Sequence, residues 1–170
     1  KAIESCRDLL ENFGGHTYAA GLSLKEENLD AFTQRFLKLA ADEIIPEQMT
    51  PQIDIDAVLD LQDINSKFMS ELKKMNPFGP DNQKPVFCSL GVKDYGTSKL
   101  VGKDLEHIKL ELIDDKSNTP IHGIAFGMHQ HNTHIKNMKP FNICYTIEEN
   151  TYNGNTSLQL MVKDIKENDI

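Results

Sequence analysis

Residues 14–21, GGHTYAAG, join two glycines and a histidine to a second cluster of small residues. Glycine has no Cβ to block a ligand and tolerates positive φ, so the backbone amides of such a segment can face an anion. A histidine beside them can donate a hydrogen bond to phosphate. The alternative is structural, with the glycine pair ending a helix and His16 packed in a strand. These residues alone leave both interpretations open.

A second candidate site lies in the strand-like segment HIKLEL, residues 107–112. His107 and Lys109 alternate with apolar residues, so one strand face is apolar and the other could meet a nucleic-acid backbone. Two more basic residues precede this segment and could extend the stripe: Lys99 and Lys103. The alternative is a solvated strand face, since Glu106 and Glu111 dilute the positive charge. Spacing alone favours neither interpretation.

Aromatic and metal-ligating residues are weaker signals. Three aromatic residues could stack bases or belong to the core: Tyr95, Phe126 and Tyr145. His129, His131 and His134 have no matching carboxylate or cysteine nearby in an expected loop, so we interpret them as solvated or as weak adventitious ligands. The simplest account of Asp54 and Asp56 is two solvated carboxylates on an edge strand. We therefore predict no metal site within this chain.

The first half of the chain has helical periodicity. Apolar spacing predicts a helix over residues 2–13, a short strand after His16, and a second helix down to about Asp42 with an apolar stripe in the core. Ser23 and Glu26 resemble a capping box at the start of that second helix. The proline-containing segment 44–52 is the best linker candidate. An edge strand near residues 53–61 and a helix near residues 64–75 follow.

From residue 86 onward the pattern changes to strands. Five apolar or alternating runs are separated by Asp, Asn, Gly and Pro: 85–92, 107–114, 120–127, 141–149 and 158–165. The Asn153–Gly154 pair is a strong hairpin-turn signal. Short strands after a helical half favour a small antiparallel barrel or sandwich.

Charge and composition narrow the function classes. The net charge is -8, which taken alone counts against a dedicated nucleic-acid binder, because such proteins usually carry an excess of basic residues. Residues 91–170 are nearly balanced, with 9 Lys+Arg against 11 Asp+Glu, so a local basic stripe is compatible with the acidic whole. Three widely spaced cysteines suit a reducing cytoplasm. No apolar run reaches the length of a membrane span, so we expect a cytoplasmic protein without membrane contact.

Four segments in order carry a family resemblance. GGHTYAAG resembles the GGHxxAAG motif of the DHH-associated domain in DHH-family phosphoesterases. MNPFGPDNQKPVF resembles the L-x-PFGxxNxxPxF segment of the RecJ single-strand-specific exonucleases. VGKDLEHIKLEL and IHGIAFG resemble the VGxxxxHLKL and IDAIAFG segments of the OB domain in that family, with departures at Ile108 and at His122–Gly123. The resemblance extends to about Gly127.

The resemblance implies a carboxyl-terminal piece of such an exonuclease, which also fits a chain that opens on Lys1 without an initiator methionine. In that family an upstream DHH domain binds Mn²⁺ or Mg²⁺ and hydrolyses single-stranded DNA from the 5′ end. No DHH triplet occurs here, so the metal would lie outside this chain. The family's GGHxxAAG loop contacts substrate phosphate, and the resemblance gives that role to Gly14, Gly15, His16, Ala20 and Gly21. It also favours DNA binding by Lys99, Lys103, His107 and Lys109.

The predicted fold class is therefore α+β. A helical/α-β remnant of a DHH-associated domain, residues 1–45, is followed by a linker with a strand and a connecting helix, residues 46–85. A small antiparallel β-barrel of the OB type, residues 86–170, would bind single-stranded DNA.

Two other functions stay open. The barrel could chiefly be a protein-interaction module that docks single-strand-binding protein or another repair factor through its acidic surface. A less favoured option is a relative that acts on short oligonucleotides or cyclic dinucleotides. The OB-like segment argues against that option, because those smaller enzymes usually end soon after the GGHxxAAG domain.

Overall fold

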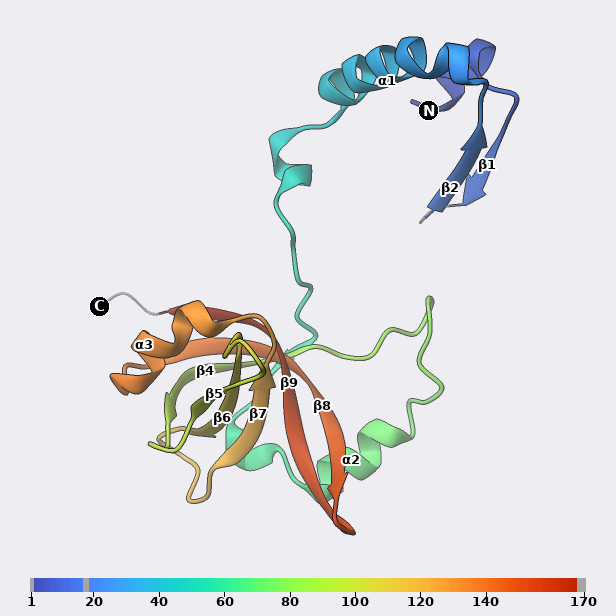
Figure 1. The fold of residues 1–170 in the computed structure, drawn as a ribbon. Helices are drawn as coiled ribbons and strands as arrows, with labels where there is room; N and C mark the ends of the chain where they lie inside the picture. Colours follow the sequence, from blue (N-terminus) through green and yellow to red (C-terminus); the bar gives the residue numbers. More distant parts are fainter. Residues whose placement is uncertain (1, 17–18, 168–170) are drawn as a thin grey trace. The chain divides into compact units, whose positions relative to one another are not determined.

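The computed structural model describes residues 2–16 and 19–167. Its contacts divide the chain into two compact units, Lys1–Ile53 and Asp54–Ile170 (Figure 1). The division falls at the end of the proline-containing segment 44–52. The domain limits drawn at residues 45 and 85 stay predictions.

The first unit contains a β-hairpin and one long helix. Its elements are η1 Glu4–Leu9, β1 Asn12–His16, β2 Ala19–Ser23, η2 Glu26–Asn28, α1 Leu29–Glu43 and η3 Pro46–Met49. The predicted second helix is confirmed in α1, whereas the prediction of a helix over residues 2–13 is wrong. The first turn is a short 3-10 helix, and the chain becomes extended at Asn12 because residues 12–16 pair with β2.

The glycine pair lies inside β1 rather than in a turn. Gly14 is the register partner of Gly21, and Gly15 is the partner of Ala20. A Cβ on Gly15 would lie 2.6 Å from the carbonyl oxygen of Ala19 and 2.7 Å from the Cα of Ala20, so no larger residue fits there. A Cβ on Gly14 would meet nothing within 4 Å. Close approach of the partner strand therefore accounts for one glycine of the pair.

Helix α1 has a half-buried apolar side rather than a core face. No residue of α1 is buried, and Leu29, the first residue of the predicted apolar stripe, is 51% exposed. The expectation that its stripe forms a core is therefore wrong for the residues that the structure describes. The helix is tied to η1 by an ion pair between Arg35 and Asp8 at 2.5 Å. The capping-box expectation also fails, because the N-cap residue is Asn28, and its side chain donates instead to the carbonyl of Leu9 at 3.1 Å.

The second unit is built around a seven-stranded sheet. Its strands are β3 Ala57–Val58, β4 Phe87–Asp94, β5 Lys99–Val101, β6 His107–Ile113, β7 Ile121–Ala125, β8 Phe141–Tyr152 and β9 Asn155–Glu167. The order is β3-β4-β8-β9-β7-β6-β5, and a further pairing of β4 with β6 closes five of the strands into a barrel (Figure 1). All five strands predicted after residue 85 form. The three-residue strand β5 was not predicted.

The barrel is mixed rather than purely antiparallel, which corrects the predicted fold. Strands β7 and β9 pair in parallel, with Gly123 opposite Leu160, and β3 pairs in parallel with β4. Parallel neighbours need a crossover connection. Between β7 and β9 that connection contains η5 His129–His131, α3 Asn132–Lys136 and strand β8. Alternation along single strands does not reveal which neighbour they pair with.

One hydrophobic core fills the second unit. Inward side chains of all five barrel strands are fully buried, among them Leu110, Tyr145 and Leu160 at 0% exposure. The β8–β9 hairpin turns at Asn153–Gly154, where both residues have positive φ (49° and 79°), as the Asn-Gly signal predicts.

The segment before the barrel packs onto the same core. It contains β3, the short helix η4 Leu61–Asp63 and α2 Ser66–Lys73. Leu61, Ile64 and Leu72 belong to the buried cluster. The side chain of Asn65 caps α2, because its Oδ1 accepts hydrogen bonds from the amides of Lys67 and Phe68 at 3.1 and 3.0 Å.

Candidate nucleic-acid interface

The outer face of strands β6 and β7, together with the neighbouring strand β5, carries three of the four basic residues predicted to bind DNA. Along β6, buried Ile108, Leu110 and Leu112 alternate with outward-facing residues, as the period of a strand requires. Lys109 lies opposite Ile124 of β7, and Glu111 lies opposite His122. In OB barrels this pair of strands, with the loops that border it, is the surface that binds oligonucleotides.

Two of the predicted lysines are neighbours on this face. Lys99 of β5 is the register partner of Lys109, and both are exposed. Lys103 follows in the exposed turn between β5 and β6. Among the described residues, no carboxylate lies within ion-pair distance of any of these three ammonium groups. By contrast, Lys84 pairs with Glu148 at 2.7 Å elsewhere on the barrel. The three lysines are therefore free to meet an anionic backbone.

The two glutamates near these lysines, Glu106 and Glu111, accept hydrogen bonds from neighbouring groups. Glu106 accepts a hydrogen bond from the amide of Asp104 at 2.9 Å. Hydrogen bonds from its own amide and that of Asp104 hold the pKa of the Glu106 carboxyl below its usual value. Glu111 accepts a hydrogen bond from the Thr97 hydroxyl and lies 3.6 Å from Nδ1 of His122. Neither of these carboxylates forms an ion pair with a lysine of this face, so the ammonium groups stay available to an anion.

His107 has a more structural position than the sequence suggested. Its Nδ1 accepts a hydrogen bond from the amide of Gly127 at 3.0 Å, and its Nε2 lies 3.3 Å from Glu106. Its ring meets that of Phe126 edge to face, with centroids 4.9 Å apart. His107 thus fixes the end of β7 against the start of β6 and holds an aromatic ring in place.

The three aromatic candidates separate into two groups. Tyr145 is fully buried, and its hydroxyl hydrogen-bonds with Ser89 at 2.7 Å, so burial raises its pKa and it belongs to the core. Tyr95 and Phe126 are 51% and 55% exposed. Base stacking needs an accessible aromatic face beside a basic groove. Phe126 is the better candidate of the two, because its exposed ring lies against His107, which is two residues from Lys109 along β6.

The small-residue segment belongs to the first unit, whereas the lysine face belongs to the second. Gly14, Gly15 and His16 end β1, and Ala20 and Gly21 belong to β2. None of the three glycines has positive φ. Thr17 and Tyr18, between the two strands, lie outside the described residues. The phosphate-binding role of this hairpin stays a prediction.

The histidine-rich segment, residues 129–134, contacts a carboxylate that lies far from it in the sequence. His131 Nδ1 lies 2.8 Å from one oxygen of Glu167, and His134 Nδ1 lies 3.2 Å from the other. The His134 side chain is 9% exposed, and its Nε2 contacts the carbonyl of Pro140 at 3.2 Å. The expectation of solvated loop histidines is therefore wrong for His131 and His134. Their partner is about 33–36 residues away, at the end of β9.

Neither metal chemistry nor a membrane helix is found in the described part of the chain. No group of three or more His, Cys, Asp or Glu residues there could hold a metal ion. Asp56, one of the two aspartates considered for a cation, instead accepts a hydrogen bond from the amide of Val86 at 2.8 Å. No helix in the described residues is long and apolar enough to cross a membrane.

Sequence reasoning missed the polar residues that border this face on β8 and β9. Gln159 is the register partner of His122. A cavity of about 340 Å³ is lined by Lys109, His122, Asn150, Ser157 and Gln159. The parallel pairing of β7 with β9 brings these residues beside Lys109. No local pattern in the sequence predicts that pairing.

Comparisons with known proteins agree on one family. A family model described as the RecJ OB domain matches residues 55–164. The single-stranded-DNA-specific exonuclease RecJ of Bacillus subtilis is 28% identical over 165 residues, covering 96% of this chain and 20% of that protein. The Escherichia coli RecJ is 27% identical over 157 residues, covering 92% of this chain and 26% of that protein. The chain thus spans about a fifth to a quarter of the length of these relatives.

Solved structures show the same fold. Crystal structures of RecJ from Thermus thermophilus in complex with Mg²⁺ and with Mn²⁺ superpose with TM-scores of 0.74 and 0.75, each at 21% sequence identity. Both cover 99% of this chain, and this chain covers 25% and 24% of theirs. The barrel topology, the matched residues 55–164 and the relatives' similarity along nearly the whole chain lead to one conclusion: the chain belongs to the RecJ OB domain family.

Proposed function

We propose that this chain is the substrate-binding region of a 5′-to-3′ single-stranded-DNA exonuclease that acts in recombination and repair. The relatives named above carry that single-strand-specific exonuclease activity as whole proteins. Phosphodiester hydrolysis would use divalent metal ions that activate water and stabilise the leaving oxygen. Those ions would be bound outside this chain, which on its own would bind DNA without cutting it.

The lysine face is the observation that carries this proposal. Lys99 and Lys109 lie side by side on the outer face of β5 and β6, without carboxylate partners among the described residues. Phe126, at 55% exposure, offers a stacking surface beside them. Single-strand binding typically combines unpaired ammonium groups with an exposed aromatic ring. The ammonium groups contact the phosphates, and the ring stacks on a base.

Two further parts of the proposal rest on resemblance and composition. The β1–β2 hairpin, with His16 at the end of β1, would contact substrate phosphate close to the scissile bond. The three free cysteines, Cys6, Cys88 and Cys144, are all buried, which suits a reducing cytoplasm. Single-strand-binding protein is a candidate partner, and none of the contacts described above bears on it.

Fluorescence anisotropy with a labelled single-stranded oligonucleotide tests the proposal. We expect affinity to fall steeply between about 50 mM and about 200 mM salt, because each neutralised phosphate releases counterions. A Lys99→Glu/Lys109→Glu variant should bind at least about tenfold more weakly, and its salt slope should fall by about 0.7 for each phosphate that it no longer neutralises. Duplex DNA should bind more weakly than the single strand.

The matched control is Lys67→Glu/Lys74→Glu, within and directly after α2, which makes the same change of charge at two exposed lysines outside the barrel face. It should bind as the unmodified chain does. Equal losses in both variants would mean that only overall charge matters. Absence of binding at low salt would contradict the proposal and favour the alternative in which the barrel docks a protein partner.

A further inference from the structure

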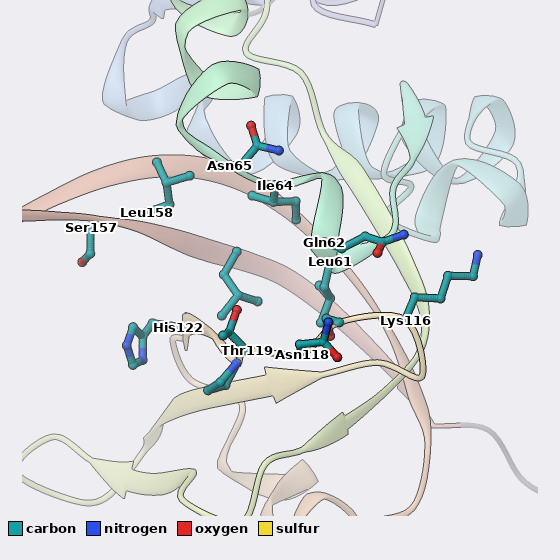
Figure 2. A pocket seen from close by; sticks show the side chains of 13 residues that line it. Leu61, Gln62, Ile64, Asn65, Lys116, Asn118, Thr119, His122, Ser157 and Leu158 are labelled. Atoms are coloured by element: carbon teal, nitrogen blue, oxygen red, sulfur yellow. The ribbon is translucent and has the colours of Figure 1, made fainter.

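A polar cleft lies next to the lysine face, on the far side of His122. It has a volume of about 460 Å³ and is formed by three segments, residues 61–65, 116–122 and 157–158 (Figure 2). The cavity of about 340 Å³ that contains Lys109 shares His122 and Ser157 with this cleft. The two hollows therefore border the same pair of side chains, and a ligand can extend from one to the other.

The lining of the cleft is neutral and rich in hydrogen-bonding groups. Carboxamides and hydroxyls come from Gln62, Asn65, Ser117, Asn118, Thr119 and Ser157. No carboxylate among the described residues lines it, and its one ammonium group, that of Lys116, pairs with Asp60 at 2.7 Å. A carboxamide both donates and accepts, so it suits the mixed donor and acceptor edge of a nucleobase better than a phosphate.

Most of these polar groups have no partner of their own in the described structure. The side chains of Gln62, Asn118 and Thr119 make no hydrogen bond to another described residue and are exposed. Asn65 uses its Oδ1 to cap α2, which leaves its amide nitrogen as a donor. Apolar side chains complete the lining and could cover the flat face of a base: Leu61, Ile64, Pro120, Ile121 and Leu158.

His122 marks the boundary between the two hollows. Its Nδ1 is buried without a hydrogen-bond partner, and the nearest carboxylate oxygen, on Glu111, is 3.6 Å away, too far for a hydrogen bond. On the β6–β7 ladder His122 is the diagonal neighbour of Lys109, about 7–8 Å away. A single nucleotide spans such a distance between its phosphate and its base.

We propose that this cleft takes one unstacked nucleobase of a DNA single strand whose phosphates follow Lys99 and Lys109. The inference rests on the proposed function and adds to it a base-binding site that is distinct from the lysines that contact the backbone. His122 lies at the entrance, Asn118 and Thr119 contact the base edge, and the apolar side chains cover its face. Phosphate contacts set the salt dependence of binding, whereas this cleft sets the contribution of the bases.

The test compares a labelled thymidine oligonucleotide with an abasic deoxyribose-phosphate strand of the same length. The 170-residue chain should bind the thymidine strand more tightly. An Asn118→Ala/Thr119→Ala variant should lose about three- to tenfold in affinity for the thymidine strand, with little change for the abasic strand and an unchanged salt slope. Far-UV circular dichroism checks that the variant is folded, and Asn137→Ala, an exposed asparagine after α3, is the matched control.

The outcomes separate the two proposals. Equal binding of thymidine and abasic strands, or unchanged discrimination in the double variant, would overturn the base cleft while leaving the lysine face intact. Binding of neither strand would overturn the proposed function and the cleft together. Loss in Asn137→Ala equal to that in the double variant would also overturn the cleft.

Discussion

The two units of this chain carry similar apolar patterns but bury them very differently. In the unit Asp54–Ile170, inward residues of every barrel strand reach 0–8% exposure. In the described residues of the unit Lys1–Ile53, Cys6 is the one buried hydrophobic side chain, and Leu29 in the apolar stripe of α1 is 51% exposed. Periodicity identifies the apolar side of an element, whereas burial requires a second surface to pack against it. The barrel supplies that surface within the unit itself.

The largest expected difference between the units comes from the same substitution made in each. Leu110→Ala removes a fully buried side chain from β6 and should cost about 2–5 kcal/mol of unfolding free energy, because it leaves a cavity in a closed barrel. Leu29→Ala in the apolar stripe of α1 should cost less than about 1 kcal/mol, because that side chain is already half exposed. Urea unfolding followed by far-UV circular dichroism measures both.

Similar losses in the two leucine variants would break the comparison. They would mean that the face of α1 is packed in solution, and that the first unit is as cooperative as the barrel. Hydrogen exchange in peptides from α1 and from β6 would then identify which amides had become less protected.

A smaller effect is expected at the loop between β6 and β7, which is hydrogen-bonded to the pre-barrel segment through Asp114. Asp114 accepts hydrogen bonds from the amides of Leu61, Lys116 and Ser117 at 2.8, 3.0 and 2.7 Å. Asp114→Ala leaves these donors unpaired and should cost about 1–3 kcal/mol. Asp115→Ala is the control, because that side chain is 87% exposed and its ion pair with Lys93 should contribute less than about 1 kcal/mol.

The contribution of Asp114 should also depend on pH. Burial raises the pKa of its carboxyl, but the hydrogen bonds from Leu61, Ser117 and Lys116 outweigh this, and the pKa in the folded state lies below its usual value. The stabilisation is therefore fully present above the unfolded-state pKa of about 3.9 and is lost as pH falls through the folded-state value. The difference between the unmodified chain and Asp114→Ala should shrink on acidification, and a constant difference would refute the assignment.

A finer test of the comparison lies within the first unit. Gly15→Ala places a Cβ 2.6 Å from the carbonyl oxygen of Ala19, whereas Gly14→Ala meets nothing within 4 Å. We expect the first change to weaken the β1–β2 hairpin by about 1 kcal/mol through overpacking and the second to be nearly neutral. Exchange of amides in residues 12–16 and 19–23 measures this. Neither change should alter unfolding of the barrel, and a shift there would contradict the division into two units.

The predictability of the fold follows the same division. Strands β4 and β6 to β9 and the turn at Asn153–Gly154 were predictable because alternation and turn chemistry are local properties. The β7–β9 parallel pairing was not, and neither was the contact of His131 and His134 with Glu167, because each joins segments far apart in sequence. The exposed lysines could be predicted as a stripe. The carboxamides beside them could not, since only the closed barrel brings them together.

The smallest expected effect concerns how α3 is held to the barrel. Glu167→Gln weakens the contacts with His131 and His134, which lie 2.8 and 3.2 Å from its oxygens, but leaves Ile135 buried in the core. We expect a loss of about 0.5–1 kcal/mol, seen as faster amide exchange in α3. Glu148→Gln, which weakens an exposed pair with Lys84, should leave α3 unchanged. Unchanged amide exchange in Glu167→Gln would mean that the packing of Ile135 alone positions α3. The crossover helix would then be held by apolar packing, as the barrel strands are.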